Sequence, residues 1–137
     1  MLRFASLASA LFLACAATAA HAQESTLNAA ERAELESGFR QAVEQIKPTL
    51  PRKLDDHTTL IDVSNEGVQM IYLHTLTLKL ALADQDRLAG VLKQRVCGSE
   101  EMRRTLIWGA TFNYKYEDAN GNPVAAIEIA NSDCASL

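Results

Sequence analysis

Residues 111–130 alternate between apolar and polar side chains on both sides of a short turn, and this pattern constrains the fold most strongly. Successive side chains of a β-strand point to opposite faces, so such alternation predicts strands with one buried face. The turn, residues 118–122, is rich in residues that hairpins prefer. We therefore expect residues 111–117 and 124–130 to form an antiparallel pair whose aromatic stripe belongs to the core. The apolar positions are Phe112, Tyr114, Tyr116, Ile127 and Ile129.

A second pair of strands is predicted earlier in the chain. The runs 59–64 and 68–76 are strand-like, and Asn65-Glu66-Gly67 between them supplies the residues of a tight turn. The alternation is imperfect, which leaves the register open between a two-residue and a three-residue loop.

A helix is predicted before this hairpin. Asn28, followed three positions later by Glu31, suits a capping box at its start. Pro48 and Pro51 should end the helix and hold the next connection extended. The apolar stripe of the helix is Leu35, Phe39, Val43 and Ile46.

Two more helices are predicted between the hairpins. Asp84 suits the N-cap of the first, whose apolar face would be Leu88, Val91, Leu92 and Val96. Ser99 should cap the second, and Gly109 is a natural residue to follow its end. Trp108, beside that glycine, is expected to be a packing residue.

The predicted order is therefore helix, hairpin, two helices, hairpin (α-β-β-α-α-β-β). The apolar stripes are buried if the two hairpins form a four-stranded antiparallel sheet with the helices on one face, which is an α+β fold. No low-complexity linker interrupts residues 23–137, so we predict a single domain there.

The first residues have the composition of a secretory signal peptide. Arg3 precedes an apolar run that is shorter than the roughly 20 residues needed to span a bilayer. Ala20-His21-Ala22 provides the small residues that signal peptidase requires, so the predicted signal peptide is 1–22. The mature protein would start at Gln23 and be periplasmic or secreted.

Lipid anchoring at Cys15 is the alternative for this segment. A lipoprotein signal is cut before such a cysteine, although Leu13 is bulky where a small residue is usual. Mass spectrometry of the mature N-terminus separates the two, because Gln23 and an acylated Cys15 differ in mass.

The charge of the chain argues against two classes of partner. The net charge is -4, and -5 once Arg3 is removed with the signal peptide. A mildly acidic domain lacks the positive surface that a phosphate backbone requires, so nucleic-acid binding is not expected. The sequence also lacks an amphipathic segment with a basic face, which binding to a membrane surface would need.

Two cysteines remain after cleavage, Cys97 and Cys134. In an exported protein they are expected to form one disulfide. Closing a loop of about 38 residues would stabilise the fold by about 4 kcal/mol. Two unpaired thiols are the alternative, and redox activity is not expected because neither cysteine belongs to a C-x-x-C pair.

The stretch KLDDHTTL, residues 53–60, is a candidate chemical site. Asp55, Asp56 and His57 are consecutive, and in an extended chain only alternate side chains point to the same side. Aspartate and threonine commonly bond to local backbone groups where elements meet. The stretch is therefore predicted to be a structural corner.

A polar site with a second histidine is the alternative reading of this stretch. Either register of the first hairpin places His74 opposite Thr58 or Thr59, within reach of Asp56 or His57 through a bound metal or anion. The regular ligand spacings of zinc sites are absent from the sequence, so no metal site is assigned.

Two longer phrases resemble a known family. LPRKLDDHTTLIDV resembles its entry to a first hairpin, and VCGSEEMRRTLIWGATFNYKYEDANGNPVAAIEI resembles its order of Cys, helix, Gly, aromatic strand, turn and strand before a final Cys. Both are similar to small exported Gram-negative proteins described as quorum-sensing-regulated virulence factors, and to their uncharacterised relatives. The resemblance covers roughly residues 50–134. It implies an α+β fold, export and the pairing of Cys97 with Cys134, and it implies no catalytic residues.

The expected function is that of a non-enzymatic protein-binding or accessory envelope factor. Its partner would be another envelope or exported protein, bound through the unpaired edges of the hairpins. The alternative is a small-ligand or metal-binding periplasmic module that uses His57 and His74. No catalytic residue and no cofactor are expected, and the sequence predicts neither the oligomeric state nor the identity of the partner.

Overall fold

The computed structural model describes residues 27–136, apart from the side chains of residues 82, 83 and 136. The predicted signal peptide, its cleavage site and Cys15 lie outside the described residues. Within residues 27–136, no helix is both long and apolar enough to cross a membrane. The elements are α1 (Ala29–Ile46), the 3₁₀ turn η1 (Lys47–Thr49), β1 (Arg52–Lys53), β2 (Thr58–Glu66), β3 (Gln69–Leu76), α2 (Leu82–Gly98), α3 (Glu100–Ile107), β4 (Thr111–Glu117), β5 (Pro123–Ile129) and η2 (Asn131–Ser136).

Helix α1 begins and ends where the sequence predicts. The Asn28 side chain accepts a hydrogen bond from the Glu31 backbone N–H, and the Glu31 carboxylate accepts one from the Asn28 N–H, both at 2.9 Å. This pair is the predicted capping box. The α-helix gives way to η1 at Lys47, next to Pro48.

Helix α2 starts earlier than the sequence predicts. Its N-cap is Ala81, so Asp84 lies in the first turn, where the helix dipole still favours a carboxylate. Ser99 caps α3 as predicted, and its hydroxyl accepts a hydrogen bond from the Met102 N–H at 3.3 Å. Gly109 follows α3 with a φ of +89°, a left-handed conformation that glycine adopts without strain.

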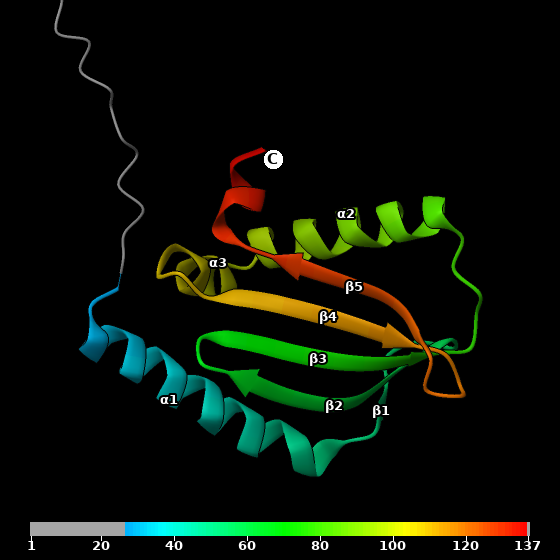
Figure 1. Cartoon of the computed structure of the whole chain (residues 1–137), viewed down its shortest axis with the longest axis horizontal. Coiled ribbons are helices and arrows are strands. Elements are labelled where there is room, and N and C mark those ends of the chain that lie inside the picture. Colours follow the sequence, from blue (N-terminus) through cyan, green and yellow to red (C-terminus); the bar gives the residue numbers. More distant parts are fainter. Residues whose placement is uncertain (1–26, 137) are drawn as a thin grey trace, which may run out of the picture.

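The strands form one five-stranded sheet in the order β1-β2-β3-β4-β5 (Figure 1). Both predicted hairpins are present, as the antiparallel pairs β2–β3 and β4–β5. The prediction of four antiparallel strands is wrong in two respects. The short strand β1 is added at one edge, and β3 and β4 are parallel because α2 and α3 carry the chain back across the sheet between them.

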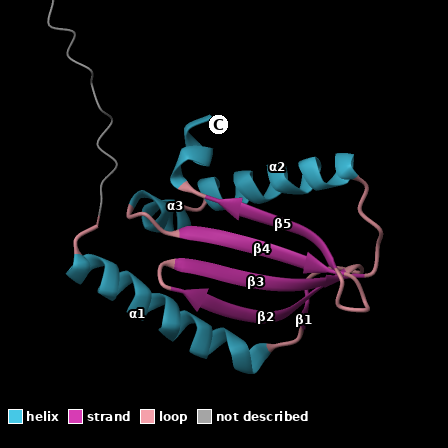
Figure 2. Cartoon of the chain, viewed as in Figure 1, coloured by secondary structure: helices cyan, strands magenta, loops and turns pink. Residues whose placement is uncertain are grey.

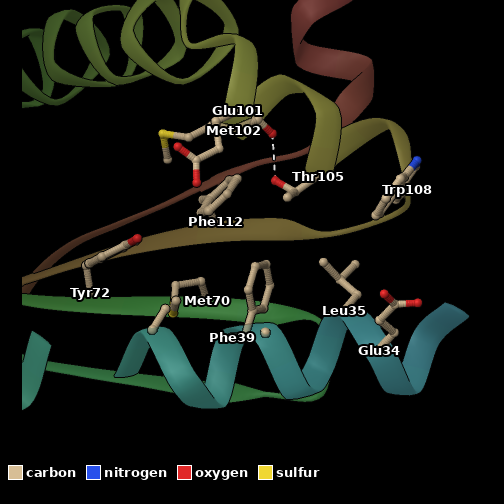
Figure 3. Close-up of a pocket in the computed structure, with 12 residues that line it drawn as sticks. Glu34, Leu35, Phe39, Met70, Tyr72, Glu101, Met102, Thr105, Trp108 and Phe112 are labelled. Atoms are coloured by element: carbon tan, nitrogen blue, oxygen red, sulfur yellow. Dashed lines mark hydrogen bonds between the residues drawn. The ribbon is translucent and has the colours of Figure 1, made fainter. Parts of the chain in front are cut away.

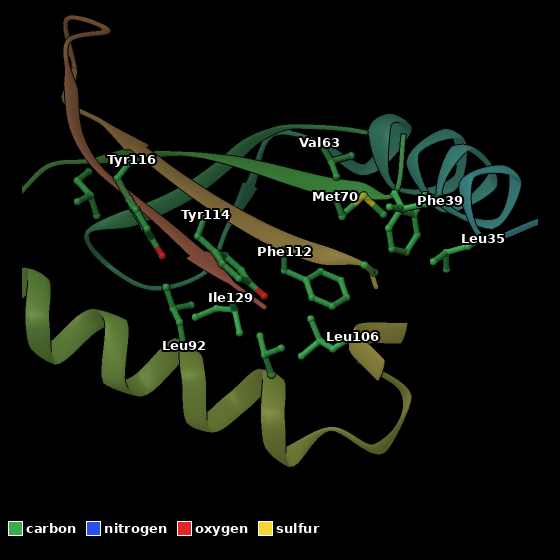
Figure 4. Close-up of a cluster of buried hydrophobic side chains, with 14 residues drawn as sticks. Leu35, Phe39, Val63, Met70, Leu92, Leu106, Phe112, Tyr114, Tyr116 and Ile129 are labelled. Carbon is green, nitrogen blue, oxygen red and sulfur yellow. The ribbon is translucent and has the colours of Figure 1, made fainter. Parts of the chain in front are cut away.

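The helices pack on one face of the sheet, as predicted. The strand register places Met70 beside Phe112 and Phe112 beside Ile129 on this face. Figure 4 shows the labelled side chains of the sheet and the helices meeting in one layer. The aromatic stripe of β4 is buried there, so its assignment to the core is confirmed. The helices contribute Leu35 and Phe39 from α1, Leu92 and Val96 from α2, and Leu106 from α3.

The three helices cover different parts of the sheet. Helix α1 lies beside β2 and α2 lies beside β5, with the short α3 near the start of β4 (Figure 1, Figure 2). The middle strands β3 and β4 therefore form the part of the sheet that lies between α1 and α3.

A disulfide joins the end of α2 to η2. Cys97 and Cys134 are bonded, with their Cα atoms 5.4 Å apart and 37 positions apart in sequence. An ion pair also joins α2 to η2, between Lys93 and Asp133 at 3.3 Å. The bridge ties the turn between α2 and α3 to the residues after the last strand, which is the arrangement that the sequence predicts.

Candidate functional site

The KLDDHTTL stretch forms a polar corner between β1 and β2. Asp55 Oδ1 accepts a hydrogen bond from the His57 N–H at 2.8 Å, and this bond holds the pKa of Asp55 below its usual value. The Asp56 carboxylate lies 3.3 Å from Lys53 Nζ, and His57 Nδ1 lies 3.2 Å from Thr77 Oγ1. Asp55, Asp56 and His57 are exposed. These contacts are local, as expected for a structural corner.

His74 does not have the neighbour that the sequence predicts. It pairs with Leu60, not with Thr58 or Thr59. Two features cause the difference: β2 continues as far as Glu66, so the turn comes later than its residues indicate, and the register then shifts by one residue between Leu60 and Asp62. In this register His74 lies beside Tyr116 of β4, on the helix-covered face of the sheet, while His57 lies in the exposed corner.

The surroundings of His74 are aromatic. Its side chain is 4% exposed, and its ring stacks on Tyr116 at 4.7 Å and on Tyr114 at 6.2 Å between centroids. The Lys115 carbonyl lies 3.2 Å from Nδ1, so a protonated Nδ1 donates to it. The structure thus does not bring Asp56, His57 and His74 into one site. Across residues 27–136, no three His, Cys, Asp or Glu side chains are grouped so that they could hold a metal ion.

The burial of His74 predicts a pH-dependent stability. Burial lowers the pKa of His74 below its usual 6.5, against the opposing effect of its bond to the Lys115 carbonyl. The unfolded chain therefore takes up this proton first, so stability that is complete above about pH 6.5 is lost as the pH falls toward the lowered pKa. We expect the melting temperature to fall between pH 7.5 and pH 5 in the wild type and to fall less in His74→Phe.

The aspartates with lowered pKa values titrate at a lower pH than the histidine range. Asp118 and Asp133 have pKa values lowered by hydrogen bonds, to Asn122 and to the Ala130 N–H respectively, so they titrate below pH 3.8. Their contribution to stability is lost only at a pH lower than the histidine range. Equal pH slopes for the wild type and His74→Phe between pH 7.5 and pH 5 would contradict the assignment to His74.

An apolar groove of about 490 Å³ lies between α1 and α3, on the helix-covered side of the sheet (Figure 3). One wall comes from α1 and the other from α3, and the floor comes from β3 and β4. The side chains of Met70 and Phe112 in the floor are almost fully buried beneath it. The lining residues are Glu34, Leu35, Gly38, Phe39 and Ala42 of α1, Met70 and Tyr72 of β3, Glu101, Met102 and Thr105 of α3, Trp108 and Phe112.

Each wall of the groove is a regular helical ridge. The α1 wall repeats every four residues at Glu34, Gly38 and Ala42, which places these positions one above the other on a single face. At Gly38 a Cβ atom would meet nothing within 4 Å, so this wall is open at its centre. The α3 wall runs from Glu101 to Trp108. Trp108 was expected to pack in the core, but its side chain is 48% exposed at one end of the groove.

The polar groups of the groove are few. The Thr105 hydroxyl donates to the Met102 carbonyl at 2.7 Å, so it is already bonded within α3. Burial raises the pKa of Tyr72, whose ring stacks on Tyr114 at 5.2 Å between centroids, and the phenol is neutral at physiological pH. The groove therefore offers apolar contact area, one phenol and two carboxylates.

The sequence carried two weak indications of this groove. A glycine inside an otherwise regular helix, as at Gly38, makes the helix less stable than an alanine would by about 0.5–1 kcal/mol, so its presence suggests a packing or functional role. The single tryptophan next to a helix end is the other. Neither indicates a groove by itself, because the groove depends on the separation of two helices that are distant in the chain.

Comparisons with known proteins identify the fold. No family model matches the sequence, and no curated protein matches it. A Pseudomonas aeruginosa protein described as secreted has a TM-score of 0.68 and 20% identity, over 79% of this chain and 99% of its own. The pilotin EpsS of the Vibrio vulnificus type 2 secretion system has a TM-score of 0.68 and 13% identity, over 78% and 97%. The type II secretion pilotin AspS of Vibrio cholerae has a TM-score of 0.64 and 13% identity, over 77% and 97%.

At these identities the similarity shows a shared fold. The predicted α+β class is thereby supported across nearly the whole length of the matched proteins. No family model supports the finer expectation of a virulence-factor family.

Proposed function

We propose that this chain is an exported accessory protein of the bacterial envelope, and that it binds a segment of another envelope or exported protein in the groove between α1 and α3. The groove is the observation that carries the proposal. It presents an apolar floor, formed by Met70, Tyr72 and Phe112, between two helical walls. Peptide-binding domains commonly receive a partner's apolar side chains in grooves of this kind.

Trp108, just after α3, adds to the same surface. It lines the groove and is 48% exposed, although it is a large apolar side chain. Exposed tryptophans are over-represented among the residues that carry most of the binding energy of protein interfaces. A partner seated in the groove would cover the Trp108 side chain.

The groove suits this role better than the hairpin edges do. The inner edges of the two predicted hairpins are paired with each other as β3 and β4, so only β1 and β5 remain as edge strands. β1 has two residues, and β5 begins at Pro123, which cannot donate a backbone hydrogen bond. An added strand would have to pair with the outer side of β5 or with β2 beyond Leu60, whereas the groove offers a concave apolar surface.

The similar structures support a partner among secretion components. EpsS and AspS are pilotins of type II secretion systems, and they share the fold at low identity. The proposal for this chain is correspondingly general: an accessory factor whose partner belongs to an envelope assembly.

A small apolar ligand is the second candidate occupant. A volume of about 490 Å³ falls within the range of small-molecule pockets, about 300–1,000 Å³. Native mass spectrometry of the exported protein distinguishes this case, because a bound small molecule would add a discrete mass.

Site-specific photo-cross-linking tests the proposal. A photoreactive amino acid at Ala42, in the groove wall, is expected to cross-link an exported or envelope protein when the full chain is expressed in its own host. The same amino acid at Ala119, an exposed residue of the last hairpin turn, is the control and should give no such product. Mass spectrometry identifies the cross-linked protein.

A pair of glycine substitutions shows whether the groove itself is used. Gly38→Phe should fill the groove and abolish the product, because nothing opposes a side chain there. Gly90→Phe is the matched control, since Gly90 is also an exposed glycine inside a helix with nothing within 4 Å, and it does not line the groove. Cross-links that persist in Gly38→Phe, or that capture only cytoplasmic proteins, would refute the proposal.

A further inference from the structure

Two carboxylates stand at opposite ends of the groove. Glu34 on the α1 wall lies toward the Trp108 end, and Glu101 on the α3 wall lies toward the Tyr72 end (Figure 3). Both side chains are exposed. Neither belongs to an ion pair in the part of the chain that the structure describes.

The neighbouring acids on the same helices behave differently. Glu36 pairs with Arg40 at 2.9 Å, and Glu100 pairs with Arg104 at 3.0 Å, each one helical turn along its own helix. Arg40 and Arg104 thus compensate acids that do not line the groove. The groove lining contains no lysine, arginine or histidine, so its charge is negative.

The floor of the groove restricts the conformation of an occupant. β3 is hydrogen-bonded to β2 and β4, and β4 is hydrogen-bonded to β3 and β5. No strand edge is therefore open in the floor, and an extended peptide would find no backbone partners there. A helix bonds its own backbone groups and needs only apolar contact along one face.

We propose that the groove selects a short amphipathic helix of the partner protein, whose apolar face is flanked by lysine or arginine side chains that pair with Glu34 and Glu101. This inference rests on the proposed function and adds the chemistry of the partner segment. The α1 wall from Glu34 to Ala42 extends about 12 Å at 1.5 Å per residue. Because Glu34 and Glu101 lie on opposite walls and toward opposite ends of the groove, the two cations should flank the apolar face of the segment on opposite sides and near its opposite ends.

Three synthetic peptides of about 14 residues test this chemistry; an isolated helix of this length is only marginally stable in water, so the peptides should fold on binding. They share one leucine face and carry lysine, glutamine or glutamate at the two flanking positions. Trp108 is the only tryptophan of the chain and lines the groove, so its fluorescence reports binding of each peptide to the full chain. Exposed ion pairs are individually weak, so at low salt we expect the lysine peptide to bind up to about tenfold more tightly than the glutamine peptide, and the glutamate peptide to bind weakest.

Matched substitutions assign the preference to the two carboxylates. The double variant Glu34→Gln, Glu101→Gln should bind the lysine and glutamine peptides equally. The control Glu36→Gln, Glu100→Gln removes two acids one or two positions away and should keep the preference. Salt of about 0.5 M should reduce the preference in the wild type, because it screens exposed charges.

The outcomes separate this inference from the proposed function. Equal binding of the lysine and glutamine peptides by the wild type, or a preference that persists in Glu34→Gln, Glu101→Gln, overturns the inference. If no peptide binds while the Ala42 cross-link depends on the groove, the inference is also overturned and the proposed function stands. If no peptide binds and the cross-link is absent or insensitive to Gly38→Phe, both are overturned.

Discussion

Replacement of Cys134 by serine is expected to lower the free energy of unfolding by about 4 kcal/mol. The disulfide with Cys97 closes a loop that spans 37 positions, and opening it allows the unfolded chain many more conformations. The loop contains α3, β4 and β5, so the bridge constrains two of the five strands together with one wall of the groove. Urea denaturation of the full chain, with and without reductant, measures the change.

The control for this prediction is the reduced wild-type protein. Reductant should lower its stability to that of Cys134→Ser, while the variant itself should be insensitive to reductant. Cys97 is buried, so Cys97→Ser also places a hydroxyl in the core and is the less clean substitution. A loss below about 1 kcal/mol in Cys134→Ser would contradict the stabilising role of the bridge.

Local features of the fold could be predicted from the sequence. The alternation around residues 118–122 determines a hairpin because both strands and the turn are adjacent in the chain. The capping box of Asn28 and Glu31 is equally local, and it forms as predicted. The aromatic stripe that includes Tyr114 and Tyr116 is buried because every second residue of β4 faces the helices.

Pairings between distant segments could not be predicted in the same way. The parallel register of β3 and β4 depends on the path of α2 and α3, and no residue pattern within either strand encodes it. β1, with residues Arg52 and Lys53, is too short to show a periodicity. The predicted partner of His74 was wrong for a related reason, since β2 extends to Glu66 and the register shifts again between Leu60 and Asp62.

The groove is the least predictable feature of the molecule. Its walls are separated by about sixty residues in the sequence, and its existence depends on how far α1 and α3 stay apart over the sheet. The helical pattern correctly places Leu35 and Phe39 on the inward face of α1. It does not indicate that Gly38, on the same helix, faces open space.

Truncation of Leu106 to alanine is expected to lower the free energy of unfolding by about 2–5 kcal/mol. Leu106 is fully buried, with 0% of its side chain exposed, and it fixes α3 to the sheet core. Removing its branched end leaves a cavity that the surrounding side chains fill only in part. Because α3 forms one groove wall, the same variant should also weaken peptide binding reported by Trp108.

The adjacent residue provides a matched control for this truncation. Ile107 is 50% exposed, so Ile107→Ala removes little buried surface, and alanine has a higher helix propensity than isoleucine by a few tenths of a kcal/mol. We expect its stability to stay within about 0.5 kcal/mol of the wild type. The two substitutions lie one position apart on the same helix, so a difference between them reports which face of α3 is packed. Equal losses at both positions would mean that α3 is held by another face, and the wall that carries Glu101 and Thr105 would then have to be reassigned.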